Sequence, residues 1–148
     1  MNTKTIVGTE VYLDLEYSEK GKLKNESDIY SLGVVLFELL SGRVAYDQIY
    51  VAESTKGHAE VTRKRFNEGA LKNIIDPELV EEVDDNLSGL KIGANQESLE
   101  VFANIAIRCL EITQDKRPTM KVVIEGLQNA LNLQSRITGK NATQFEHI

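Results

Sequence analysis

The sequence predicts a mainly α-helical domain, and three observations lead to that prediction. Apolar residues recur with the spacing of one helix face in two segments, 97–112 and 120–133. A third segment, 29–40, is apolar on every side of a helical wheel, which is typical of a buried core helix. The 148 residues have the size of one ordinary domain, and a single cysteine excludes a disulfide scaffold.

The central helix is expected at residues 27–41. A strand is the rival interpretation because valines occur here, but about twelve apolar residues is long for a strand. Ser27 or Asp28 can cap the start of the helix, and Gly42 can end it. The preceding residues, 1–26, are polar and are expected to form loops.

The middle of the chain is less regular. Residues 43–56 are expected to form a loop, and residues 57–68 a short amphipathic helix that ends at Gly69. Residues 74–77 are expected to be extended before a turn, because the residue before a proline avoids the helical conformation. Residues 81–95 combine acidic residues with glycines and are expected to form a mobile loop.

Two more helices are expected at residues 97–112 and 120–133, and Thr119 can cap the second one. Residues 134–148 show no periodicity and are expected to be a flexible C-terminal tail. The domain is therefore expected to cover residues 1–133. The apolar face of the first of these helices comprises Leu99, Phe102, Ile105, Ala106, Cys109 and Leu110.

Composition and charge argue against several classes of function. The net charge of −6, from 17 basic and 23 acidic residues, disfavours nucleic acid or anionic lipid as the main partner. The most apolar stretch contains Glu38 and is far shorter than the ~20 residues of a membrane-spanning helix. No secretion signal is recognisable, so a reducing, cytoplasmic location is expected. His58 has no second histidine or cysteine at ligand spacing, so no metal site is expected, and Cys109 is expected in the core.

Four short motifs resemble plant receptor-like serine/threonine protein kinases. Residues 8–17 read GTEVYLDLEY and resemble the end of the activation segment, which commonly reads G-T-x-x-Y-L-x-P-E-Y in that family. Residues 24–39 resemble the stretch in which a serine-aspartate pair opens the central helix of the large lobe. Residues 74–77 resemble the linker that follows, and residues 116–120, KRPTM, resemble the R-P-[ST]-M that opens the last helix. The resemblance implies a helical half of the large (C) lobe of the protein kinase fold, with long connecting loops.

The resemblance also shows which kinase motifs these residues lack. The family holds ATP with a glycine-rich loop and a lysine, and it needs an H-R-D-x-x-x-x-N loop and a D-F-G aspartate for catalysis and for magnesium. None of these motifs occurs in the sequence. We therefore expect part of a kinase domain that has no catalytic residue and no cofactor and does not transfer phosphate by itself. ATP and magnesium are implied only for a full-length member of the family.

Five residues receive roles from the resemblance alone. Thr9 and Tyr12 correspond to the family's substrate-docking loop. Glu16 corresponds to a glutamate that forms a structural ion pair with an arginine, here Arg117. Asp28 corresponds to the central-helix aspartate, which accepts hydrogen bonds from the catalytic loop.

Two functional hypotheses follow from the resemblance. The first is a piece of a signalling kinase that phosphorylates proteins and that could be tethered at the plasma membrane in its full-length form. The alternative is a non-catalytic binding module or decoy that docks kinase substrates or regulators. Leu15 stands where the family has proline, which loosens the chain and puts the shape of the docking loop in doubt. Self-association is also expected, because the central helix would expose apolar side chains without the rest of the lobe.

Overall fold

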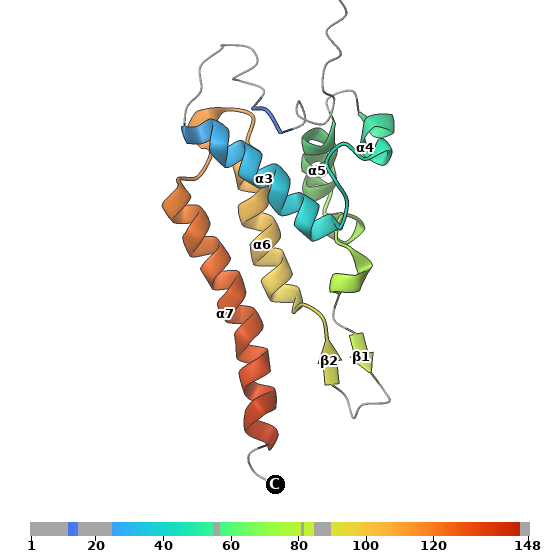
Figure 1. Ribbon diagram of the computed structural model, residues 1–148, viewed down its shortest axis with the longest axis vertical. Coiled ribbons are helices and arrows are strands. Elements are labelled where there is room, and N and C mark those ends of the chain that lie inside the picture. The colour runs from blue at the N-terminus through green and yellow to red at the C-terminus, as the bar shows by residue number, and fades with distance from the viewer. Residues whose placement is uncertain (1–11, 15–24, 55–56, 81, 85–89, 146–148) are drawn as a thin grey trace, which may run out of the picture.

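The computed structural model describes residues 12–14, 25–54, 57–80, 82–84 and 90–145, and helices dominate them, as expected. Figure 1 shows α3 lying diagonally across α6, with α7 alongside α6 and with α4 and α5 on the opposite side. The elements are α3 (Asn25–Ser41), α4 (Gln48–Glu53), α5 (His58–Asn67), β1 (Glu82–Asp84), β2 (Leu90–Ile92), α6 (Gln96–Cys109), α7 (Met120–Phe145) and the short 3-10 helices η1 (Leu71–Asn73), η2 (Pro77–Leu79) and η4 (Gln114–Lys116).

The central helix α3 is buried on several sides, as its apolar sequence predicts. It approaches α6 at Gly33, where an added Cβ would lie 2.7 Å from the Cβ of Cys109. Glycine at this position therefore permits the close contact between the two helices. Gly42 ends α3 with a φ of +67°, and its N–H donates to the Glu38 carbonyl at 2.9 Å, which confirms the predicted stop. The main core contains Tyr30, Val34, Phe37, Leu40, Ala103, Ala106 and Leu110.

Two helix boundaries differ from the sequence prediction. Helix α3 begins at Asn25, so Ser27 and Asp28 lie in its first turn and do not cap it. Helix α7 runs to Phe145, beyond the expected end at residue 133. Apolar periodicity reports which side of a helix packs against a core, and Figure 1 shows that the C-terminal end of α7 extends beyond α6. The aperiodic sequence of residues 134–145 therefore does not predict the helix that forms there, and the flexibility expected for this tail stays a prediction.

Two segments expected to be loops contain regular structure. Within residues 43–56, α4 forms behind an N-cap, because the Asp47 side chain accepts a hydrogen bond from the Ile49 N–H at 3.1 Å. Within residues 81–95, β1 and β2 pair antiparallel. All three elements are too short for a periodic pattern to be recognised in the sequence.

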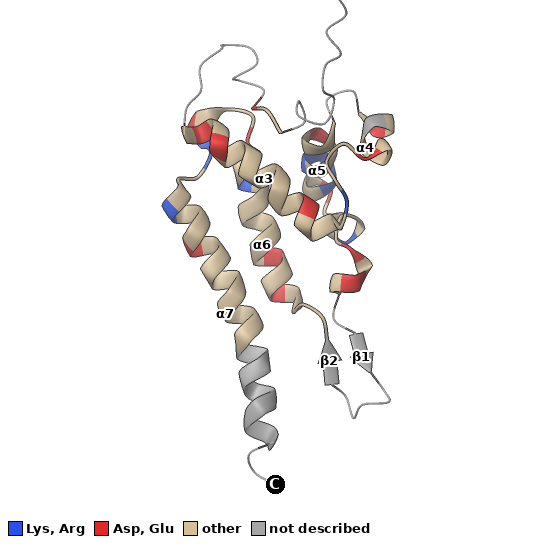
Figure 2. Ribbon diagram, in the orientation of Figure 1, with Lys and Arg blue, Asp and Glu red and all other residues tan. Residues whose placement is uncertain are grey.

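Charged residues are spread over several elements. Figure 2 shows acidic residues on α3, α4, η2 and α6, and basic residues on α5 and near the start of α7. None of the helices in the described part of the chain combines the length and the apolar character needed to cross a membrane.

Candidate functional site

The short segment 12–14 is held against α3 by the side chain and the backbone of Tyr12. The Tyr12 hydroxyl donates to Oε1 of Glu38, and the Tyr12 carbonyl accepts from the Ser31 hydroxyl at 2.7 Å. The same Glu38 oxygen accepts from the Ala45 N–H at 2.8 Å. Glu38 therefore joins segment 12–14 to the connection between α3 and α4.

The electrostatic surroundings keep Tyr12 a hydrogen-bond donor. The hydrogen bond to Glu38, together with burial and the charge of that carboxylate, raises the pKa of Tyr12 to about 12. The hydroxyl consequently stays protonated at neutral pH, where Glu38 can accept its hydrogen bond. Tyr12 is nevertheless partly exposed, so its contact with α3 remains open to solvent.

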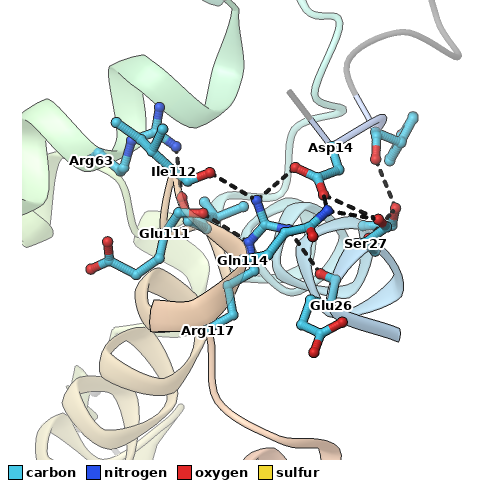
Figure 3. A network of polar contacts seen from close by, with 11 residues as sticks. Asp14, Glu26, Ser27, Arg63, Glu111, Ile112, Gln114 and Arg117 are labelled. Carbon is cyan, nitrogen blue, oxygen red and sulfur yellow. Dashed lines mark hydrogen bonds and ion pairs between the residues drawn. The ribbon is translucent and has the colours of Figure 1, made fainter. Parts of the chain in front are cut away.

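A buried ion pair anchors the other end of the segment. Nη2 of Arg117 lies 2.6 Å from Oδ1 of Asp14, and both side chains are fully buried. Figure 3 shows Gln114 and Ser27 directed at the same carboxylate, with donor distances of 2.8 and 3.1 Å to its Oδ2. The described residues thus offer the charge of Asp14 one cation and two neutral donors, as a buried carboxylate requires.

Arg117 also holds two stretches of backbone together. Its guanidinium donates to the carbonyl oxygens of Glu26 and Glu111 at 2.8 Å and of Ile112 at 3.2 Å. It also lies over the Tyr30 ring, with 4.9 Å from Cζ to the ring centroid. A planar side chain with five donors suits this arrangement, which joins the start of α3 to the chain after α6.

The structure describes some of the residues to which the family resemblance gives a role, and others lie outside the described residues. Thr9 and Glu16 lie outside the described residues, so the pair between Glu16 and Arg117 stays a prediction. Arg117 is buried, and its carboxylate partner within the described residues is Asp14. Tyr12 contacts α3 through Glu38 and Ser31, and its implied role in docking stays a prediction.

Asp28 is exposed in the first turn of α3, where its charge complements the helix dipole. It lines a pocket of about 590 Å³ together with Ile29, Pro118 and Met120. None of the described residues donates a hydrogen bond to its carboxylate, so this carboxylate can accept donors from another segment. The implied contact with a catalytic loop stays a prediction.

Sequence reasoning missed Asp14, Glu38 and Gln114. Asp14 stands inside the motif of residues 8–17, two positions before Glu16, so its acidity was a visible signal. Glu38 was also visible, as the one acidic residue in the apolar stretch of α3. Gln114 carries no comparable signal, because a lone glutamine in a polar connection is ordinary.

His58 is a buried polar residue outside this network, at the start of α5. Its ring lies between Tyr50 and Phe37, with centroids 4.7 and 6.2 Å away, and neither ring nitrogen has a hydrogen-bond partner among the described residues. Burial lowers the pKa of His58 to about 4, although the charge of Glu38 opposes the shift. In the described part of the chain no group of three or more histidine, cysteine, aspartate or glutamate residues could hold a metal ion.

No family model matches this sequence. The receptor-like protein kinase ANXUR1 of Arabidopsis thaliana is 40% identical over 138 residues, which are 93% of this chain and 15% of that protein. Wall-associated receptor kinase 5 of the same plant is 35% identical over 128 residues, 85% of this chain and 16% of that protein. The probable serine/threonine-protein kinase PBL28, also of Arabidopsis thaliana, is 33% identical over 126 residues, 85% of this chain and 31% of that protein. The chain thus spans between about a sixth and a third of the length of these relatives.

The fold is also found among solved structures. A pseudokinase domain, that of the immune regulator BIR2 of the RLK/Pelle family, matches with a TM-score of 0.64 at 21% sequence identity. The match covers 84% of this chain and 34% of that domain's chain. The described residues therefore have the arrangement of a helical part of a protein kinase domain.

Proposed function

We propose a function for this chain as a member of the plant receptor-like protein kinases, to which it belongs as a helical part of their kinase domain. In the proposal it is the part of the large lobe that holds the substrate-docking loop. The complete protein then transfers phosphate from ATP to serine or threonine of other proteins in signalling, in the cytoplasm. ATP and magnesium belong to that complete protein and not to these 148 residues.

The observation that carries the proposal is the double anchoring of segment 12–14. A docking loop must keep one conformation while a substrate binds beside it, because misplacement of the reacting groups slows phosphate transfer. Tyr12 fixes one end of the segment on Glu38 and Ser31, and the buried pair between Asp14 and Arg117 fixes the other.

A chimaera tests this proposal. These residues replace the homologous part of an active receptor-like kinase domain, and transfer of radiolabelled phosphate to a protein substrate is measured. We expect activity, and we expect Tyr12→Phe to raise KM for the protein substrate while KM for ATP is unchanged. Tyr46→Phe, at a neighbouring exposed tyrosine, is the matched control. A folded chimaera that binds ATP but transfers no phosphate would contradict the proposal.

The isolated chain is proposed to be inactive in phosphate transfer. Its sequence holds no glycine-rich phosphate loop, no H-R-D motif and no D-F-G motif, which position ATP and magnesium in the family. The test is incubation of the purified 148-residue chain with radiolabelled ATP, magnesium and a protein substrate. Incorporation above a heat-killed control would overturn this part of the proposal.

A second candidate function is a non-catalytic module or decoy that docks kinase substrates or regulators. It is favoured by the fact that Glu38, Ser31 and Arg117, which hold segment 12–14, all belong to this chain. The native mass discriminates between the candidates, with an antibody to residues 57–68 applied to tissue extract. A band near 16.6 kDa favours the module, and a band of kinase size favours the enzyme.

The chain is also proposed to associate with itself or with the rest of a kinase lobe. Leu39 on α3 is 64% exposed, and Ile124 and Leu131 on α7 are 58% exposed. Large exposed apolar side chains on two helices favour burial against another surface. Sedimentation at several concentrations tests self-association, and a monomer throughout would contradict it.

A further inference from the structure

A pocket of about 480 Å³ lies apart from segment 12–14, between the η1–η2 region and the first turns of α6. Figure 1 shows the start of α6 low in the molecule, near β2, whereas segment 12–14 lies along α3 near the top. The volume falls in the range of ligand-binding pockets in proteins. The pocket residues have no part in the proposed phosphate transfer, so the two sites can be tested independently.

The wall of the η1–α6 pocket is mainly apolar. Leu99 lies in the first turn of α6 and is almost fully buried, and Val80 on the opposite wall is 47% exposed. An apolar group that entered the pocket would cover Val80 and remove its surface from water. The remaining apolar lining consists of Leu71, Ile75 and Ala94.

Two opposite charges stand at the wall of this pocket. Lys72 comes from η1 and Glu100 from α6, and both residues are exposed. No ion pair between them, or between either of them and another described residue, occurs within 4.0 Å. Gln96 donates to Oε1 of Glu100 at 2.9 Å, which orients that carboxylate and leaves Oε2 as an acceptor. Each charge can therefore meet a charge on a ligand.

The pocket is formed without a ligand because hydrogen bonds hold its walls. The Asp76 N–H donates to the Leu40 carbonyl at 2.9 Å, which ties the η1–η2 region to the end of α3. The Ala94 N–H donates to the Leu79 carbonyl at 2.8 Å and joins the two walls. The Asn95 N–H donates to Oε1 of Gln134 at 2.7 Å, which fixes the start of α6 on α7. A preformed site loses little entropy when a ligand binds.

The geometry points to a peptide-docking site for a segment in which an apolar side chain is flanked by an acidic residue on one side and a basic residue on the other. The apolar side chain occupies the pocket against Leu99 and Val80. The acidic residue meets Lys72, and the basic residue meets Glu100. This occupant is chosen by charge complementarity, since a purely cationic or purely anionic segment would leave one of the two charges opposite a like charge.

The test uses four synthetic nine-residue peptides with a central phenylalanine. One carries an aspartate and an arginine on its two sides, one the aspartate alone, one the arginine alone and one neither. Binding to the isotope-labelled 148-residue chain is followed by NMR titration. We expect shifts at Leu71, Ala94 and Leu99, and a two- to five-fold loss of affinity for each charge removed, as for exposed ion pairs.

Two substitutions sharpen the test through mutant cycles between protein and peptide. Glu100→Gln should abolish the benefit of the peptide's arginine and keep that of its aspartate, and Lys72→Met should do the reverse. Glu125→Gln and Lys121→Met, at an exposed acid and an exposed base on α7, are matched controls that should change neither. No binding, shifts outside the pocket, equal affinity of all four peptides, or preference for a peptide with a single charge would each overturn the proposal.

Discussion

Two buried polar side chains, Arg117 and His58, have opposite surroundings in this fold: the first has many polar contacts and the second lies between aromatic rings. Arg117 keeps its charge and is surrounded by Asp14, three backbone carbonyls and the ring of Tyr30. His58 lies between two aromatic rings, with both nitrogens unpartnered among the described residues. An arginine cannot lose its proton in a protein, whereas a histidine becomes neutral at an accessible pH. The first group therefore needs a polar network, and the second can be buried as a neutral ring.

The largest effect is expected at Arg117. Arg117→Ala should lower the free energy of unfolding by ~3–5 kcal/mol, because the carboxylate of Asp14 stays buried without its cation. Lys116→Ala, at the adjacent exposed lysine, should have almost no effect. Thermal and urea unfolding of the two variants measure the difference. Equal effects would show that the buried network contributes no more than a surface charge.

Asp14 and Glu16 are competing candidates for the partner of Arg117. The structure pairs Arg117 with Asp14 at 2.6 Å, so Asp14→Asn should cost about 3 kcal/mol, and Glu16→Gln should cost much less. Urea unfolding of both variants decides between them. A larger loss in Glu16→Gln would restore the pair that the family resemblance implies.

His58 should make the fold sensitive to acid. Its pKa is about 4 in the folded chain and about 6.5 when unfolded, so between these values only the unfolded chain binds the proton. Stability therefore rises with pH across this window, and about 2–3 kcal/mol is lost as the pH falls from 6.5 through 4. Urea unfolding between pH 4 and pH 7 measures the slope. His58→Phe should flatten it, and an unchanged slope in that variant would assign the effect to carboxylates.

The smallest effect is expected at Tyr12. Tyr12→Phe removes one donor from Glu38 and leaves the Ala45 N–H in place, so a loss of ~1 kcal/mol is expected at this partly exposed site. Hydrogen exchange should become faster at Ala45, because the loop that Glu38 holds would open more often. Unchanged exchange there would show that Glu38 holds the loop without Tyr12.

The sequence predicted the parts of this fold that bury a continuous apolar face. The central helix, the short helix after residue 56 and the last two helices were all expected, since each packs one side or more against the core. The prediction was incomplete where structure depends on other causes. Helix α4 begins behind one cap at Asp47, and the end of α7 extends beyond α6, where the sequence shows no apolar periodicity.

The candidate site was predicted in its chain segments and less well in its contacts. The motifs placed residues 8–17 and Arg117 in one site, and the structure brings Asp14 and Arg117 together across 103 positions. The contributions of Ser27 and Gln114 could not be predicted, because they depend on how the start of α3 and η4 face each other. A hydrogen bond between side chains far apart in sequence follows from packing and leaves no local pattern.

The contact between Gly33 and Cys109 gives the molecule an internal reporter of its own opening. Cys109 is the one cysteine in the sequence, it is completely buried against α3, and burial raises the pKa of its thiol to about 11. The thiol can react with an alkylating reagent only while α3 and α6 are apart and the sulfur can ionise. The alkylation rate, compared with that of the unfolded chain, therefore counts how often the core opens, without any label having to be introduced.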